Sequence, residues 1–255
     1  MTKFSIVVPF YNVQDTLPLC VESLLSQTFP RAAYEILLVD NNSTDRSAAL
    51  AARFDSIRVL SEPKQGAYAA RNHGIRAAHG EIICFTDPDC AVAPQWLQAI
   101  DDELRAPSVQ LVLGYRHYGT RLRVMELLAA YEAEKAAFVI DAQIPKLYYG
   151  FTNNMAVRRT MFEQLGLFPE RKRGGDTIMV QAVVHHKGCD AIRFARAMEI
   201  DHLEVKTVRD YYHKRAVFGQ SNQRLTELLP YRALSNRERW RVFRRTTRQQ
   251  KCSPV

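Results

Sequence analysis

The first hundred residues alternate short apolar runs with segments of helical periodicity, and no other feature of the chain constrains the fold as strongly. The apolar runs are residues 4–9, 34–39, 57–60 and 81–86, and the helical segments are 13–27, 44–54 and 68–79. Ser43 or Thr44 is expected to cap the second of these helices. Helices that join continuous apolar strands predict an α/β fold, with a mostly parallel sheet, right-handed crossovers and helices on both faces.

From residue 94 onward the pattern is less regular. It predicts helices over 94–104, 124–140, 176–187 and 205–229, the last as one helix or two, and strands over 109–113, 148–157 and 192–198. We expect one domain over residues 1–229, in halves 1–104 and 105–229, followed by a basic C-terminal helix or tail over 230–255.

The positive charge of the chain is concentrated near its C-terminus. Residues 232–251 hold eight basic residues and one acid, so they carry +7 of the net charge of +8. Trp240, Val242 and Phe243 lie among these arginines, as in a helix that rests on an anionic membrane surface. A solvated terminal helix is an equal alternative. Nucleic acid is not expected as a partner, because nothing upstream resembles a base-reading module.

Neither a membrane span nor a signal peptide is expected. No apolar run approaches the roughly 18 residues that a span needs, and Pro9 interrupts the short apolar run at the N-terminus. The five cysteines form no CxxC pair. A cytoplasmic protein with free thiols is therefore expected.

Two carboxylates follow the fourth apolar run, in the triplet Asp87-Pro88-Asp89. Such a pair can hold a divalent cation against a diphosphate, although Asp-Pro-Asp is also common in turns. Ligands of parallel sheets gather at the carboxyl ends of the strands, where residues 9–12, 40–42 and Glu62 also lie. The first strand is followed by no glycine-rich turn, and there is no P-loop, which argues against both usual nucleotide-binding motifs.

Four motifs, in their order and spacing, resemble those of family 2 glycosyltransferases of the GT-A fold. They are VVPFYN at 7–12, LVDNNSTD at 38–45, GAYAARNHGI at 66–75 and FTDPDC at 85–90. The likeness covers residues 3–104 and returns at 153–159, 174–176 and His202. It implies a Rossmann-like GT-A domain whose half 1–104 binds a nucleotide sugar and whose half 105–229 binds the acceptor.

The same resemblance implies an activity. The donor would be a nucleotide-diphosphate sugar, by default a UDP-sugar, and the cofactor Mn²⁺ or Mg²⁺. A single sugar would pass, with inversion, to a hydroxyl of a cell-envelope glycan or lipid-linked acceptor. The alternatives are a catalytically inactive binding or scaffolding module and a sugar nucleotidylyltransferase. The latter would normally show a glycine- and arginine-rich loop after the first strand, which this chain lacks.

The resemblance also assigns donor-binding residues. They are Pro9, Tyr11, Asp40, Asn42, Arg71 and Asp87. Pro9 and Tyr11 would form a wall of the base pocket, and Asp40 would accept hydrogen bonds from the base or ribose. Asp40 could instead cap the following helix. Arg71 would contact the diphosphate, and Asp87 the ribose or a metal-bound water.

Asp89 and His202 are implied as metal ligands, and the imidazole tilts the preference slightly toward Mn²⁺. Asp176, at the start of a predicted helix, is implied as the base that takes the acceptor proton, though it could equally be an N-terminal cap. Many relatives carry Glu at the position of Gly175, and an acid at the position of Asn41.

Overall fold

The computed structural model describes residues 2–120, 122–226 and 229–250. Its strands are β1 (Phe4–Phe10), β2 (Tyr34–Asp40), β3 (Arg58–Ser61), β4 (Ile82–Thr86), β5 (Cys90–Val92), β6 (Leu111–Tyr118), β7 (Asn154–Arg158) and β8 (Ile192–His202). Its α-helices are α1 (Leu17–Leu25), α2 (Ser47–Ala51), α3 (Ala67–Ala77), α4 (Trp96–Leu104), α5 (Arg123–Ala142), α6 (Arg159–Leu165), α7 (Gly175–Lys187), α8 (Val208–Thr226) and α9 (Asn236–Gln249).

One eight-stranded sheet runs through the molecule in the order β3-β2-β1-β4-β7-β6-β8-β5. Strands β3, β2, β1 and β4 are mutually parallel, and β6 is parallel to β8. Strand β7 is antiparallel to β4 and β6, and β5 is antiparallel to β8. The predicted α/β fold with a mostly parallel sheet is confirmed.

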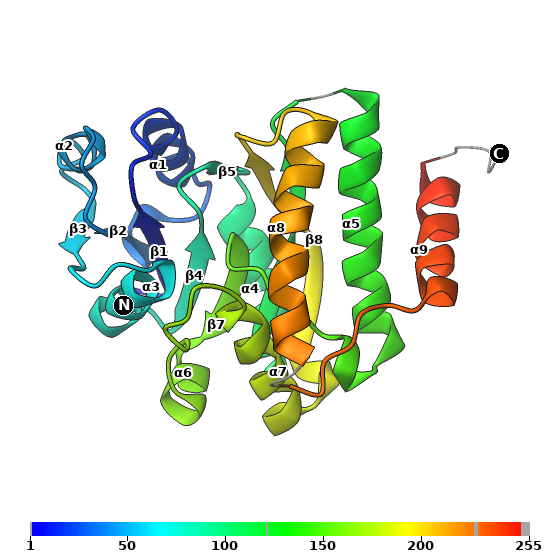
Figure 1. Cartoon of the computed structure of the whole chain (residues 1–255). Coiled ribbons are helices and arrows are strands. Elements are labelled where there is room, and N and C mark those ends of the chain that lie inside the picture. The colour runs from blue at the N-terminus through cyan, green and yellow to red at the C-terminus, as the bar shows by residue number, and fades with distance from the viewer. Residues whose placement is uncertain (1, 121, 227–228, 251–255) are drawn as a thin grey trace.

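Helices cover both faces of this sheet (Figure 1). On one face, α1 and α4 pack their apolar residues against Ile6 and Val8 of β1. On the other face, α3, α6 and α7 pack around Val7 of β1. Because alternate residues of β1 enter opposite cores, the whole strand is buried, as its continuous apolar run predicts. A third, smaller cluster lies between α5 and α8.

Several predicted helices begin two to four residues later than expected, α1 and α2 among them. Helix α1 starts at Leu17 rather than at 13, and α2 is a short helix from Ser47. The residue before α2 is Arg46, so the predicted caps Ser43 and Thr44 were wrong. The side-chain oxygen of Ser43 instead accepts the Asn12 backbone N–H, and Thr44 donates its own N–H to the Asn12 side chain. These bonds tie the ends of β1 and β2 together.

The second half of the sheet also departs from prediction. Strands β6 and β8 extend beyond the predicted ends, β7 begins at Asn154 rather than 148, and β5 and α6 were not predicted. Asn154 explains part of the extension of β6 and β8. Its Nδ2 donates hydrogen bonds to Tyr115 O and Met198 O, and its Oδ1 accepts one from Trp96 Nε1–H. These bonds hold β6 and β8 where their register shifts between Gly114 and Tyr115. Residues 227 and 228 of the helix predicted over 205–229 lie outside the described residues.

The predicted C-terminal helix is α9, which lies against α5 at one end of the molecule (Figure 1). Ser235 and Glu238 form a capping box at its start. Val242 and Thr246 are its buried residues, whereas Trp240 and Phe243 are exposed and stack at 5.4 Å between ring centroids. Residues 251–255 of the predicted tail are not described. Within the described ranges, no helix is both long and apolar enough to cross a bilayer.

Candidate active site

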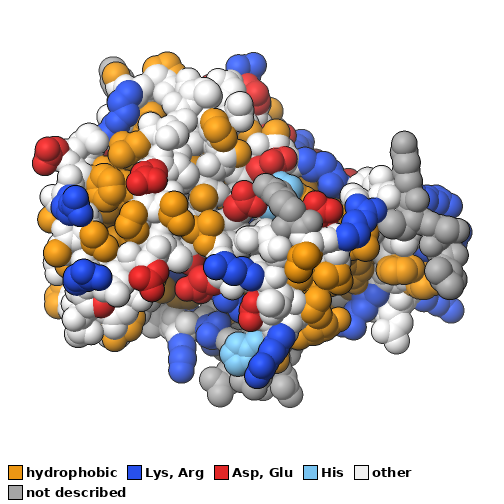
Figure 2. Space-filling model, turned by 90° about the horizontal axis from the view of Figure 1, so that it is seen from above, with side chains coloured by type: hydrophobic (Ala, Val, Ile, Leu, Met, Phe, Trp, Pro, Cys, Tyr) orange, Lys and Arg blue, Asp and Glu red, His pale blue; other side chains and the backbone are white. Residues whose placement is uncertain are grey.

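A cavity of about 340 Å³ opens at the carboxyl ends of β1 and β4. Its lining includes five predicted site residues, Pro9, Tyr11, Arg71, Asp87 and Asp89, together with Asn41, Gln65 and Glu204. Figure 2, which looks down on the molecule of Figure 1, shows acidic side chains gathered around a histidine on this face. The strand ends of the parallel half thus meet at one opening, as the sheet topology requires.

Arg71 and Asp87 form an ion pair on one side of this cavity, with Arg71 buried and Asp87 partly exposed. Arg71 comes from α3, and its Nη2 lies 2.5 Å from Asp87 Oδ1. The guanidinium also lies over the ring of Tyr68, 5.4 Å from the centroid. The Arg71 side chain is only 6% exposed, so its charge acts where solvent screens it little.

Asp89 and His202 converge at the end of β4. The pairing of β5 with β8 places His202 opposite Cys90, and His202 Nε2 lies 3.6 Å from Asp89 Oδ2. Burial, and then the nearby Lys214 ammonium, lowers the pKa of His202 to about 4. The imidazole is therefore neutral at pH 7, which is the state that binds a metal.

These two residues fit a divalent cation. Neighbouring ligands of an octahedral ion with bonds of about 2.1 Å lie about 3 Å apart, close to the observed 3.6 Å. Cys90 lies near them, with its Sγ 3.6 Å from Asp89 Oδ1. Burial, together with Asp89 and Asp87, raises the pKa of this thiol well above its usual value. The neutral thiol is a poor ligand, so the carboxylate and the imidazole are the better donors.

Lys214 and Glu204 also belong to this site, and the sequence did not indicate either. Lys214 Nζ lies 3.3 Å from Asp89 Oδ2, 3.0 Å from His202 Nε2 and 3.5 Å from Glu204 Oε2. Because an ammonium group only donates hydrogen bonds, the Nε2 lone pair of His202 must face it. The sequence does show a basic pair, Lys214 and Arg215, on a predicted helix. Helical periodicity alone cannot tell which strand end such a pair reaches.

Asp176 is linked to the same cavity through Tyr68. Its backbone N–H donates to the Tyr68 hydroxyl at 3.1 Å, and the Tyr68 ring lies beneath Arg71. Burial raises the pKa of the Asp176 carboxyl, and a hydrogen bond from Thr177 N–H and the charge of Arg71 offset this only in part. A carboxylate with a raised pKa is a stronger base than one in water.

The glycine before Asp176 has a steric explanation. A Cβ at Gly175 would lie 2.9 Å from Tyr68 Cζ, which is too close for any side chain. A glutamate at this position, which the family resemblance implies, would therefore displace Tyr68. The absence of a side chain at Gly175 thus leaves room for the Tyr68 ring, whose hydroxyl accepts the Asp176 N–H.

Asp40 and Asn42 lie beside the cavity and make local contacts. Asp40 Oδ1 accepts the Ser43 N–H at 3.0 Å. Asn42 adopts a left-handed backbone, with φ of 67°, and its amide donates to Pro63 O. Asn41, rather than either of them, lines the cavity, and its amide holds the loop before α3 through Glu62 O, Lys64 O and Gly66 N.

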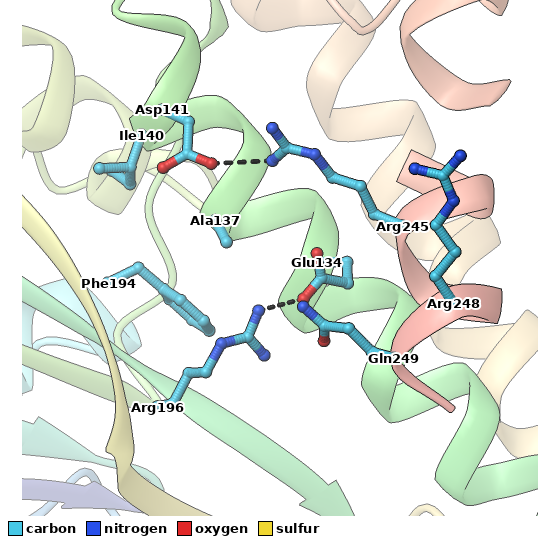
Figure 3. Close-up of a pocket in the computed structure, with 9 residues that line it drawn as sticks. All are labelled: Glu134, Ala137, Ile140, Asp141, Phe194, Arg196, Arg245, Arg248 and Gln249. Atoms are coloured by element: carbon cyan, nitrogen blue, oxygen red, sulfur yellow. Dashed lines mark hydrogen bonds and ion pairs between the residues drawn. The ribbon is translucent and has the colours of Figure 1, made fainter. Parts of the chain in front are cut away.

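A second cavity, of about 580 Å³, lies between α5, β8 and α9 (Figure 3). Two of its cations are already paired with acids of α5: Arg245 Nη1 lies 2.8 Å from Asp141 Oδ2, and Arg196 contacts Glu134. Asp87, Asp89 and His202 are not among the residues that line this second cavity. It is larger, but it lacks the converging donors that mark the first cavity as the candidate active site.

Comparisons with known proteins agree with this geometry. The family model described as glycosyl transferase family 2 matches residues 5–166. The glycosyltransferase AglE of Haloferax volcanii is 33% identical over 183 residues, which span 68% of this chain and 58% of AglE. The uncharacterized glycosyltransferase YibD of Escherichia coli is 35% identical over 111 residues, 40% of this chain and 32% of YibD. The matches thus span 32% to 58% of the length of these relatives.

Solved structures share the fold. A mannosyltransferase from Pyrobaculum calidifontis, in complex with GDP-Man and Mn²⁺, superposes with a TM-score of 0.67 at 22% identity, over 84% of this chain and 59% of that one. TarS of S. aureus, in complex with UDP-GlcNAc, gives 0.61 at 19% identity, over 81% and 62%. The motif order, the mixed sheet and the family match together show that this chain belongs to glycosyl transferase family 2.

Proposed function

We propose that this chain is an inverting, metal-dependent glycosyltransferase that moves one sugar from a nucleotide-diphosphate sugar, by default a UDP-sugar, to an acceptor hydroxyl. The observation that carries the proposal is the convergence of Asp89 and His202 beside the Arg71–Asp87 pair, with Asp176 linked to the same wall. A binding module without turnover would have no need of a base with a raised pKa at this place.

The donor enters the cavity at the strand ends. Tyr11 and Pro9 both line it, and the Tyr11 ring, which is 48% exposed, stacks on the base. Asp40 ends β2 opposite Phe10 and accepts hydrogen bonds from the base or ribose. Asn42 acts through the loop that its amide holds. The positive guanidinium of Arg71 pairs with the negative diphosphate, and Asp87 keeps the guanidinium in place.

Asp89 and His202 would hold Mn²⁺ or Mg²⁺. When bound, the cation offsets the negative charge that develops on the departing nucleoside diphosphate. The neutral imidazole is the protonation state of His202 that ligation requires. Asp176 takes the proton of the acceptor hydroxyl as the new bond forms.

The acceptor is an envelope glycan or a lipid-linked sugar, and α9 brings the enzyme to its membrane. Arg237, Arg241 and Arg244 are exposed on this helix beside the stacked Trp240 and Phe243. Aromatic rings and arginines on one exposed surface suit the interface of an anionic bilayer.

Calorimetry with UDP, GDP and their sugars, in the presence and absence of Mn²⁺, tests the proposal. We expect UDP to bind better than GDP and to bind more tightly when Mn²⁺ is present. An Asp89→Asn variant should lose the effect of Mn²⁺ and keep weak binding through Tyr11 and Arg71. Metal-independent binding of the same strength in both proteins would refute the metal assignment.

A further inference from the structure

Lys214 reaches the candidate active site from α8, which lies outside the sheet. Its ammonium contacts Asp89 Oδ2 at 3.3 Å and His202 Nε2 at 3.0 Å, the two atoms assigned above to the metal. The side chains of Asp89 and His202 are 16% and 9% exposed, so water screens charges here only weakly. A divalent ion on these ligands and an ammonium in its present place would repel each other strongly.

We propose that Lys214 is a resident counter-cation, which competes with the divalent metal for Asp89 and His202 and leaves them when the metal binds. The proposal rests on the metal assignment in the proposed function. It makes Lys214 a determinant of metal affinity rather than a ligand.

The helix that carries Lys214 is held in place by its neighbours. Tyr211 donates its hydroxyl proton to Glu132 Oε1 at 2.8 Å, and Arg215 Nη1 lies 3.3 Å from Glu132 Oε2. Glu132 is buried on α5 and is also paired with Lys135 at 2.6 Å. Because these contacts fix the α8 backbone on both sides of Lys214, the exchange needs only the flexible four-carbon side chain to move.

A second partner for the displaced ammonium is already present. Glu204 Oε2 lies 3.5 Å from Lys214 Nζ, and the Glu204 side chain is 52% exposed on the lining of the donor cavity. A small rotation of the lysine therefore exchanges Asp89 for Glu204 without leaving the ammonium unpaired. The side chain then lies at the rim of the cavity, away from the two ligands.

Titration of the protein with MnCl₂, followed by calorimetry, tests the competition without any turnover. Lys214→Met should bind Mn²⁺ about tenfold more tightly than wild type, since the competing charge is gone. Lys214→Arg keeps the charge and should stay within about twofold of wild type. Lys206→Met removes the same charge from an exposed position just before α8 and should leave the affinity for Mn²⁺ unchanged.

Glu204→Gln gives a second, independent readout. In the wild-type background this change removes the alternative partner of Lys214 as well as one negative charge, and should weaken Mn²⁺ binding. In the Lys214→Met background only the charge effect remains, so the loss should be smaller. The difference between the two losses measures the coupling of Glu204 to Lys214.

The outcomes separate this proposal from the metal assignment. If Lys214→Met binds Mn²⁺ as wild type does, or more weakly, the competition is refuted and the assignment of Asp89 and His202 stands. If neither protein binds Mn²⁺, both proposals fall. Equal losses from Glu204→Gln in the two backgrounds would refute the exchange between Asp89 and Glu204.

Discussion

The Tyr68 hydroxyl oxygen lies 3.1 Å from the backbone nitrogen of Asp176, so a residue of α3 fixes the first turn of α7. The same hydroxyl lies close enough to the Asp176 carboxylate to lower its pKa, against the larger effect of burial, which raises it. The pKa of the proposed base thus depends on a residue of α3, from the half of the chain that we propose to bind the donor.

Tyr68→Phe should therefore shift the pH dependence of transfer. Asp176 accepts a proton only when it is ionised, so kcat/KM falls as the pH drops through the pKa of this carboxyl. Loss of the hydroxyl raises that pKa further, so the acidic limb of the profile should move to higher pH. A pH profile of kcat/KM measures the shift. Tyr212→Phe, at an exposed tyrosine of α8, should leave the profile unchanged, and an unshifted limb in Tyr68→Phe would separate Tyr68 from the base.

Asp176→Asn should reduce transfer by about 10²- to 10⁴-fold, the usual contribution of a positioned base. Donor affinity should hardly change, because the hydrogen bond from Asp176 to the donor side is made by its backbone N–H to Tyr68, and the substitution keeps that group. Single-turnover rates and UDP calorimetry on the same preparation measure the two effects. Asp141→Asn, in the second cavity, is the control and should alter neither. Parallel losses of rate and donor affinity would mean that Asp176 is not the base.

The sheet could be predicted from the sequence because burial on both faces leaves a continuous apolar run, as in β1 and β2. Asp87 and Asp89 could be placed at the cavity because they directly follow such a run. The starts of α1 and α2 could not, since Asn12 and its partners Ser43 and Thr44 meet only when β1 and β2 pair.

The contacts of α8 were equally beyond prediction. Lys214 reaches Asp89 because Tyr211 and Arg215 dock α8 on Glu132, and this docking joins residues about 80 positions apart. Periodicity predicts the helix but not the surface that it covers.

Glu132→Gln should destabilise the fold by about 3 kcal/mol, because it leaves the partly buried Lys135 and the Arg215 guanidinium without their counter-charge. Burial raises the pKa of Glu132, but Lys135 and Arg215 outweigh it and lower the pKa to about 2, below the ordinary 4.5. Its stabilisation is therefore complete above pH 4.5 and is lost as the pH falls toward 2. Urea unfolding at pH 7 and at pH 3 should show a smaller difference between variant and wild type at the lower pH. Glu163→Gln, exposed on α6, is the control, and an equal loss there would remove the special role of Glu132.

Trp240 and Phe243 should carry α9 onto anionic vesicles. Their side chains are 56% and 41% exposed, whereas Val242 of the same helix is buried, so the aromatic pair is available without undocking the helix. Binding should need both the rings and the arginines. Each arginine contributes about 1 kcal/mol near an anionic surface. Wild type should sediment with vesicles of phosphatidylglycerol and phosphatidylcholine, and release with added salt.

The double change Trp240→Ser and Phe243→Ser should abolish this sedimentation, and pure phosphatidylcholine should not bind either protein. Leu19→Ser removes an equally exposed apolar side chain from α1, 52% exposed, and should leave binding intact. If wild type stays in the supernatant at low salt, or the double variant still sediments, α9 does not bind lipid. The exposed arginines of α9 would then only be solvated. Arg245 pairs with Asp141 of α5 in either case.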